Sequence, residues 1–268
     1  MNTYTHPRID MHIHGFLSSD SALDYHELCK KACELNYTSI AFTEHFDLLD
    51  TEILEYGILS LNKYFILIDK LRKEFPEINI IKGIELGEPH RVKEISDRLF
   101  KIEKPEYIIG SLHVTKKNLN VSTNINRILT INEVENYYQE NLDMVQQGGF
   151  DTLGHLSIYK RSIPYNENYP KKRLFYIIDE IFREMIKKNI CLEINFSSFF
   201  RNCISFLPEP ELLVRYRDMG GDLITIGSDS HQLEHFDKFY NKTLDSLRLL
   251  KFRCIWWKLE NKWYKLDL

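Results

Sequence analysis

Short runs of β-branched and other apolar residues recur along this chain, and segments with helical periodicity separate them. Seven such runs are expected to form strands: residues 9–13, 39–43, 78–84, 107–112, 150–155, 190–195 and 223–228. Regular alternation of strand and helix is typical of a parallel sheet with helical crossovers. Because no Gly/Ser-rich or Pro-rich linker interrupts the pattern, we expect one domain over residues 1–268.

The segments between these runs carry helix signals. An apolar stripe at helical spacing occupies residues 61–75. Asp24 and Glu27 resemble a capping box at the start of one helix, and Pro170 is expected to open another. A closed or nearly closed TIM-like α/β barrel is therefore the preferred architecture. An open doubly wound sheet is the alternative, although no Gly-rich phosphate fingerprint follows any strand.

Composition excludes several classes of protein. The chain has 268 residues, 43% of them hydrophobic, and a net charge of −4 with dispersed Lys and Arg, so no nucleic-acid partner is expected. No window reaches the roughly 18 apolar residues of a membrane span, and the first residues do not resemble a signal peptide. Five cysteines without paired spacing indicate reduced thiols. We expect a cytoplasmic monomer or homodimer that contacts no membrane.

Histidines and acids gather where the expected strands end. Six of the ten histidines and two acids stand at or just past these ends: His12, His14, His45, Glu85, His113, His155, Asp229 and His231. In a parallel barrel all carboxyl strand ends meet on one face, which is where barrel active sites lie. The i,i+2 spacing of His12 and His14 in an extended segment points both side chains to the same side.

Imidazoles and carboxylates crowded together need cations for charge compensation. Mixed nitrogen and oxygen donors suit Zn²⁺, Mn²⁺ or Fe²⁺. Each residue alone has a plainer interpretation: a single histidine after a strand is usually a hydrogen-bonded loop or core residue, and Glu85 could cap the next helix. The metal hypothesis depends on the coincidence across six strands. His6, His26, His90 and His235 show no such pattern and are interpreted as surface or structural.

The motifs "MHIHG", "FTEHFD", "GIELGE", "GSLHV", "GHLSIYKR", "LEINFSS" and "GSDSH", in this order, resemble the PHP (polymerase and histidinol phosphatase) superfamily, and its histidinol-phosphatase branch in particular. The resemblance covers about residues 8–235. It implies a distorted (β/α)7 barrel with three divalent metal ions at the carboxyl strand ends. It also implies hydrolysis of L-histidinol phosphate to L-histidinol and phosphate, in histidine biosynthesis, by attack of a metal-activated hydroxide on phosphorus.

The resemblance further implies how the ligands divide. One metal would take His12, His14, Glu85 and Asp229; a second would share Glu85 and add His113 and His155; the third would take His45, His231 and Asp20. The alternative for Asp20 is a polar turn that caps the next helix. Gly15 departs from the family, which often has Ser or Thr there, and Ser157 stands where the family often has Asp.

Cationic side chains are expected to complete a phosphate cradle. Lys160 and Arg161 follow His155, and Arg161 is preferred because a guanidinium can grip two oxygens; a solvated loop is the alternative. Glu193 and Asn195 match the family pattern and are expected to contact the ligands from behind or to contact substrate, although hydrogen bonding within the barrel mouth is equally consistent. The leaving-group acid stays open between Asp229 and a water.

Three other functions compete with this interpretation. A related phosphoesterase acting on nucleotides, phosphotyrosine proteins or nucleic-acid ends would share every ligand. The polar stretch 115–131 could belong to the substrate rim, which bears on this choice. An amidohydrolase also begins with His-x-His but usually needs a carboxylated lysine on strand four, where this chain has His113. A metal-binding protein without catalysis is the third competitor, and the complete set of ligands disfavours it.

Overall fold

A seven-stranded parallel sheet forms the centre of the molecule. The computed structural model describes residues 7–49, 53–123, 125, 127–161, 171–201 and 203–268. Each strand pairs with the next one along the chain. The strands are β1 (Arg8–Ile13), β2 (Tyr37–Phe46), β3 (Asn79–Gly87), β4 (Tyr107–Ser111), β5 (Thr152–Leu153), β6 (Cys191–Asn195) and β7 (Ile224–Gly227). All seven lie within the expected runs or extend them by a few residues.

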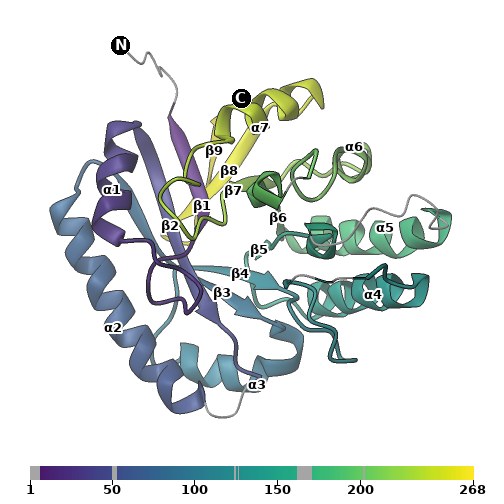
Figure 1. Cartoon of the computed structure of the whole chain (residues 1–268), viewed down its shortest axis with the longest axis horizontal. Helices are drawn as coiled ribbons and strands as arrows, with labels where there is room; N and C mark the ends of the chain where they lie inside the picture. The colour runs from purple at the N-terminus through teal and green to yellow at the C-terminus, as the bar shows by residue number, and fades with distance from the viewer. Residues whose placement is uncertain (1–6, 50–52, 124, 126, 162–170, 202) are drawn as a thin grey trace.

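The sheet curls until its first and last strands meet (Figure 1). Ile13 forms a parallel bridge with Ser230, and the amide of Asp229 donates to the carbonyl of His12 at 2.8 Å. The contact brings residues more than 200 positions apart in sequence side by side. The barrel prediction is confirmed, and the open doubly wound sheet is excluded.

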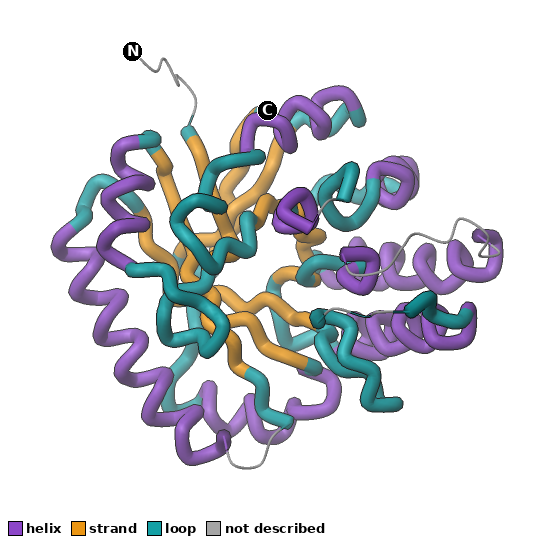
Figure 2. Tube along the Cα trace, in the orientation of Figure 1, coloured by secondary structure: helices purple, strands orange, loops and turns teal. Residues whose placement is uncertain are grey.

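Helices surround the sheet on its outer side (Figure 2). They are α1 (Tyr25–Glu34), α2 (Ile53–Glu74), α3 (Pro89–Phe100), α4 (Ile131–Gln147), α5 (Lys171–Lys188), α6 (Pro210–Asp218) and α7 (Tyr240–Leu249). Their inward faces are buried against the strands, as the stripe in α2 shows with Ile68 and Leu71 fully buried. Helix α6 is additional to the helices expected from the sequence. In the described part of the chain, no helix is long and apolar enough to cross a membrane.

The helix start signals in the sequence were partly confirmed. Asp24 caps α1, because its carboxylate accepts from the amides of His26 and Glu27. A reciprocal capping box is present at α4, where Thr130 and Glu133 satisfy each other's backbone amides. Pro170, which is expected to open a helix, lies outside the described residues.

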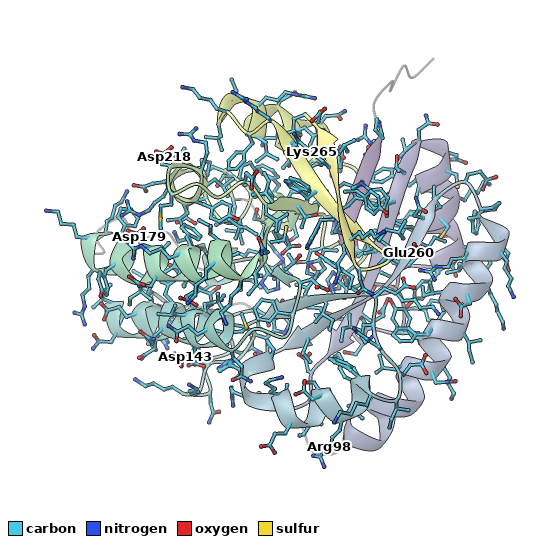
Figure 3. All side chains as sticks on the ribbon, turned by 180° about the vertical axis from the view of Figure 1, so that it is seen from behind. Arg98, Asp143, Asp179, Asp218, Glu260 and Lys265 are labelled. Atoms are coloured by element: carbon cyan, nitrogen blue, oxygen red, sulfur yellow. The ribbon has the colours of Figure 1, made fainter. Side chains whose placement is uncertain are left out.

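The last residues form a two-stranded hairpin of β8 (Cys254–Leu259) and β9 (Lys262–Asp267). Figure 3 shows it from behind, with Glu260 at its turn. Trp263 packs edge-on against Tyr107 at the start of β4, and Lys258 pairs with Asp151 just before β5. Because both partners stand at the amino ends of strands, the hairpin covers the end of the barrel opposite the clustered histidines.

Candidate metal centre

The carboxyl ends of the strands bring nine predicted side chains together. They are His12 and His14 after β1, Asp20 in the following loop, His45 in β2, Glu85 in β3, His113 after β4, His155 after β5, and Asp229 and His231 after β7. The four most enclosed of these, His12, His14, Glu85 and His155, are at most 2% exposed. Asp229 has a left-handed backbone with φ of 51°, a conformation that Asp tolerates better than most residues. Strained residues of this kind concentrate at functional sites.

The first donor group is formed by the four residues assigned to one metal. His14 Nε2 lies 2.9 Å from His12 Nε2, 3.5 Å from Glu85 Oε2 and 3.4 Å from Asp229 Oδ1. His12 Nε2 lies 3.6 and 3.7 Å from the same two oxygens. Four tetrahedral ligands about 2.1 Å from a zinc ion stand about 3.4 Å from one another. The five donor pairs that involve His12 or His14 are therefore close to the spacing that such an ion requires.

Glu85 joins this group to a second one. Its other oxygen, Oε1, lies 2.7 Å from His155 Nε2 and 3.2 Å from His113 Nε2. Ser111 donates its hydroxyl to the same oxygen at 2.6 Å. One carboxylate thus presents a different oxygen to each donor group, which is the geometry of a ligand that bridges two cations.

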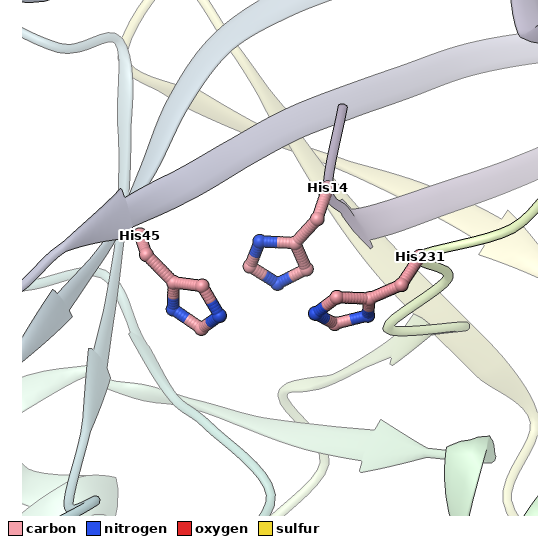
Figure 4. Close-up of side chains that lie close together, drawn as sticks. All are labelled: His14, His45 and His231. Atoms are coloured by element: carbon pink, nitrogen blue, oxygen red, sulfur yellow. The ribbon is translucent and has the colours of Figure 1, made fainter. Parts of the chain in front are cut away.

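Asp20, His45 and His231 form the third group. Asp20 Oδ1 lies 3.5 Å from His45 Nε2, and Oδ2 lies 3.2 Å from His231 Nε2. The His14 ring stacks on the rings of His45 and His231, with centroid distances of 4.3 and 4.4 Å. The three imidazoles therefore face one another (Figure 4). Because its side chain turns toward these rings, Asp20 lies where a ligand role would put it. His14, a member of the first group, also lies within ligand distance of His45 and His231 in the third.

Charge compensation dominates the electrostatics of this cluster. Burial opposes a charge on His12, yet the carboxylates of Glu193 and Glu85 outweigh burial and raise the pKa of His12. Burial also opposes ionisation of Glu85, but the surrounding imidazoles, led by His113, hold its pKa well below the usual value. The pKa of His14 differs from that of His12, because burial lowers it well below the usual value. The carboxylates are thus ionised and need positive charge, and divalent cations would supply it more strongly than protons do.

Glu193 supports the cluster from behind. Its Oε1 lies 2.5 Å from His12 Nδ1, and its Oε2 accepts from the amide of His155 at 2.5 Å. Gly227 on the neighbouring strand leaves room for this carboxylate, because a Cβ there would lie 2.2 Å from Glu193 Oε1. Glu193 therefore orients two predicted ligands, the arrangement that fixes a histidine's metal-binding nitrogen.

Arg161 reaches the same centre, and Lys160 does not. Arg161 Nη1 donates to Asp229 Oδ2 at 2.8 Å and to Ser197 Oγ at 2.7 Å. Asn195 accepts from the Ser197 hydroxyl at 2.7 Å and donates from its Nδ2 to Asp229 Oδ2 at 3.4 Å, so it supports both this contact and a predicted ligand. Lys160 pairs with Glu209 instead, and it is absent from the described residues that line the cavity.

A cavity of about 440 Å³ opens above the donor groups. Its wall contains Phe200, Arg201 and Gln232, which the sequence did not indicate, and His235, which the sequence led us to interpret as surface or structural. Phe200 stacks on His235 with ring centroids 3.8 Å apart, so His235 is part of this wall. Their only signal was proximity in sequence to the quoted motifs. Ser122 and Thr123 of the polar stretch also line the cavity, in agreement with a place for that stretch at the rim.

A parallel barrel with nitrogen and oxygen donors gathered at its carboxyl end defines a class of metal-site barrel proteins. The sequence model of the PHP domain matches residues 10–197, about two thirds of the chain. The chain belongs to the PHP domain family.

Several known proteins are similar over most of their length. The histidinol-phosphatase of Lactococcus lactis is 28% identical over 84% of this chain and 84% of its own. A Clostridium acetobutylicum protein named "Probable histidinol-phosphatase" is 28% identical over 83% of this chain and 86% of its own length. The crystal structure of the Lactococcus lactis histidinol phosphate phosphatase complexed with zinc, L-histidinol and phosphate superposes with a TM-score of 0.78, at 24% identity, over 96% of this chain and 99% of that one. This likeness confirms the distorted (β/α)7 barrel.

Proposed function

We propose that this protein is a histidinol-phosphatase that hydrolyses L-histidinol phosphate to L-histidinol and phosphate with three divalent metal ions, Zn²⁺, Mn²⁺ or Fe²⁺. The observation that carries the proposal is the position of the Glu85 carboxylate. Its two oxygens face two different donor groups beneath one cavity. Relatives named histidinol-phosphatase over most of the chain support the choice of substrate.

The donor set fits such ions because nitrogen and oxygen atoms converge at ligand spacing in a buried polar site. His12, His14, Glu85 and Asp229 would hold the first ion, Glu85, His113 and His155 the second, and Asp20, His45 and His231 the third. When bound, these ions lower the pKa of water and neutralise phosphate charge, which a slow phosphomonoester hydrolysis requires.

The protein's own groups then position the phosphomonoester. Arg161 would exchange its bond to Asp229 for phosphoryl oxygens, and Ser197 keeps the guanidinium at the cavity floor. Burial raises the pKa of Asp229, but His12, His14 and Arg161 outweigh burial and hold it well below the usual value. An ionised Asp229 serves as a ligand better than as the proton donor to the leaving alcohol.

The organic part of the substrate would occupy the outer cavity. Phe200, His235, Gln232 and the Ser122–Thr123 segment surround this space and offer aromatic and polar surface, to which Arg201 adds a cationic side chain. Nucleotide and phosphotyrosine phosphatases would use the same donor groups and differ only at this wall. The amidohydrolase alternative is disfavoured because His113 occupies the fourth strand end and directs Nε2 at Glu85.

The decisive experiment is turnover of L-histidinol phosphate by protein reconstituted with Mn²⁺ or Zn²⁺, measured as phosphate release. His12→Ala should reduce kcat/KM by at least roughly 100-fold, because it removes a ligand of the first ion. His26→Ala is the matched control, since His26 is exposed and its side chain contacts Glu74 and Phe75, both outside the cavity. A nucleotide and a phosphotyrosine peptide should be poor substrates.

Three results would contradict the proposal in different ways. Preference for the nucleotide or phosphotyrosine peptide would refute the substrate but keep the phosphatase. Metal binding without turnover of any phosphomonoester would favour a metal-binding protein without catalysis. Equal rates for His12→Ala and the unmodified protein would refute the metal centre itself.

A further inference from the structure

His14 is held from the side that faces away from the donor groups. Its Nε2 points at Glu85 and Asp229, while its Nδ1 lies 3.2 Å from the hydroxyl of Ser18. Ser18 is 2% exposed and also accepts from the amide of His45 at 3.1 Å. One buried hydroxyl therefore contacts two predicted ligands.

The direction of the Ser18 hydroxyl follows from Glu44. Ser18 Oγ lies 2.5 Å from Glu44 Oε2, while Glu44 Oε1 accepts from the amide of Gly15 at 2.7 Å and from the hydroxyl of Tyr25 at 2.6 Å. A carboxylate surrounded by three donors acts as an acceptor only. The Ser18 hydroxyl thus donates to Glu44, and Ser18 Oγ is left to accept a proton from His14 Nδ1.

This arrangement selects one tautomer of His14. A proton on Nδ1 leaves the lone pair on Nε2, the nitrogen that faces the donor groups. Hydrogen bonds of this kind to the second ring nitrogen orient metal-binding histidines and raise their basicity. The selection matters because His14 lies within ligand distance of both the first donor group and the imidazoles of the third.

Gly15 explains why Tyr25 can reach Glu44. A Cβ at position 15 would lie 2.2 Å from Cζ of Tyr25, so only glycine lets this fully buried ring lie across the loop. The Tyr25 hydroxyl that donates to Glu44 comes from the first turn of α1.

We propose that Tyr25, Glu44 and Ser18 form a positioning network that fixes the orientation and the Nδ1–H tautomer of His14 and thereby sets the affinity for divalent cations. None of the three contacts the reacting atoms; they act through His14. The inference depends on the metal centre of the proposed function and extends it to residues outside the donor groups.

The test measures cation affinity by competition with a chelator, using Zn²⁺ and Co²⁺ and no substrate. Ser18→Ala and Glu44→Gln should each weaken binding by roughly 10- to 100-fold, and Tyr25→Phe should weaken it less because two donors to Glu44 remain. Visible absorption of the Co²⁺ protein should change in the first two variants. Ser96→Ala is the matched control, a buried serine on α3 whose hydroxyl donates to the carbonyl of Lys93.

A second measurement separates positioning from general damage. ¹⁵N NMR of the Zn²⁺-loaded protein should show His14 protonated at Nδ1, and thermal unfolding of each metal-free variant should remain cooperative. Protonation of His14 at Nε2, or unchanged affinity in Ser18→Ala and Glu44→Gln, would overturn the network while leaving the proposed function intact. If the unmodified protein binds neither ion, both proposals fail.

Discussion

Glu193 illustrates how single residues behind the ligands control the site. It holds His12 through one oxygen and the backbone of His155 through the other, and it is fully buried. The sequence indicated Glu193 but left its role open between substrate contact and support of the ligands. The geometry favours support, since Glu193 is absent from the described lining of the cavity.

Replacement of this carboxylate should weaken metal binding without unfolding the protein. Glu193→Gln keeps the shape but loses the charge that raises the basicity of His12, so we expect affinity for Zn²⁺ or Mn²⁺ to fall roughly 10- to 100-fold. Gly227→Ala should act in the same direction, because its Cβ would displace the carboxylate. Chelator competition measures both variants, with Glu74→Gln on the exposed end of α2 as control. Unchanged affinity in Glu193→Gln would contradict the role.

At the scale of elements, helix α4 shows how local sequence controls stability away from the site. Thr130 and Glu133 form its capping box, and Arg127 adds a two-pronged bond to Glu133. The hydrogen bond from Arg127 is the main reason that the pKa of Glu133 is lowered to about 2, from an ordinary value of 4.5. The helix start is therefore stabilised by an ionised carboxylate.

The stability of α4 should depend on pH with a definite sign. A lowered pKa means that ionised Glu133 stabilises the folded state fully above pH 4.5, and that this contribution is lost as pH falls toward 2. Glu133→Gln should therefore lower the Tm at pH 7, and the difference from the unmodified protein should shrink at pH 3. Thr130→Ala should lower the free energy of unfolding by about 1 kcal/mol. Calorimetry across pH checks both; a difference that grows in acid would refute the ion pair.

For the whole molecule, the two ends of the barrel have different tasks. The carboxyl end collects donors whose spacing serves a cation, whereas the amino end is covered by the β8–β9 hairpin. Lys258 is 9% exposed, and its Nζ lies 2.5 Å from Oδ1 of Asp151. Asp151 also accepts a hydrogen bond from the amide of Ile108. The Lys258–Asp151 ion pair and the donor groups therefore lie at opposite ends of the barrel.

Loss of the hairpin contact should reduce stability and leave the metal centre unchanged. Lys258→Met leaves Asp151 without its cationic partner. Because Asp151 is partly exposed, we expect a loss of about 1–2 kcal/mol in the free energy of unfolding. Lys262→Met, on the exposed part of β9, should change it by less than about 0.5 kcal/mol. Urea unfolding and chelator competition measure the two properties. A large fall in metal affinity for Lys258→Met would show that the ends are coupled.

Some of this protein was determined by its sequence alone. Strand and helix alternation is a local property of apolar periodicity, so the seven strands and the barrel could be predicted. Because parallel strands share one carboxyl face, the residues that follow them could be expected to meet there. That reasoning locates His12, Glu85 and Asp229 from the sequence alone.

The tertiary structure decided what depends on contacts between distant segments. Packing at ångström precision sets three contacts: Glu85 with two donor groups, Lys160 with Glu209, and the Tyr25 ring beside Gly15. No periodicity encodes such distances, because side-chain directions and hydrogen-bond partners are chosen only when the strands close. Sequence thus determined which chemical groups share the face, and the closed barrel determined which atoms of those groups meet.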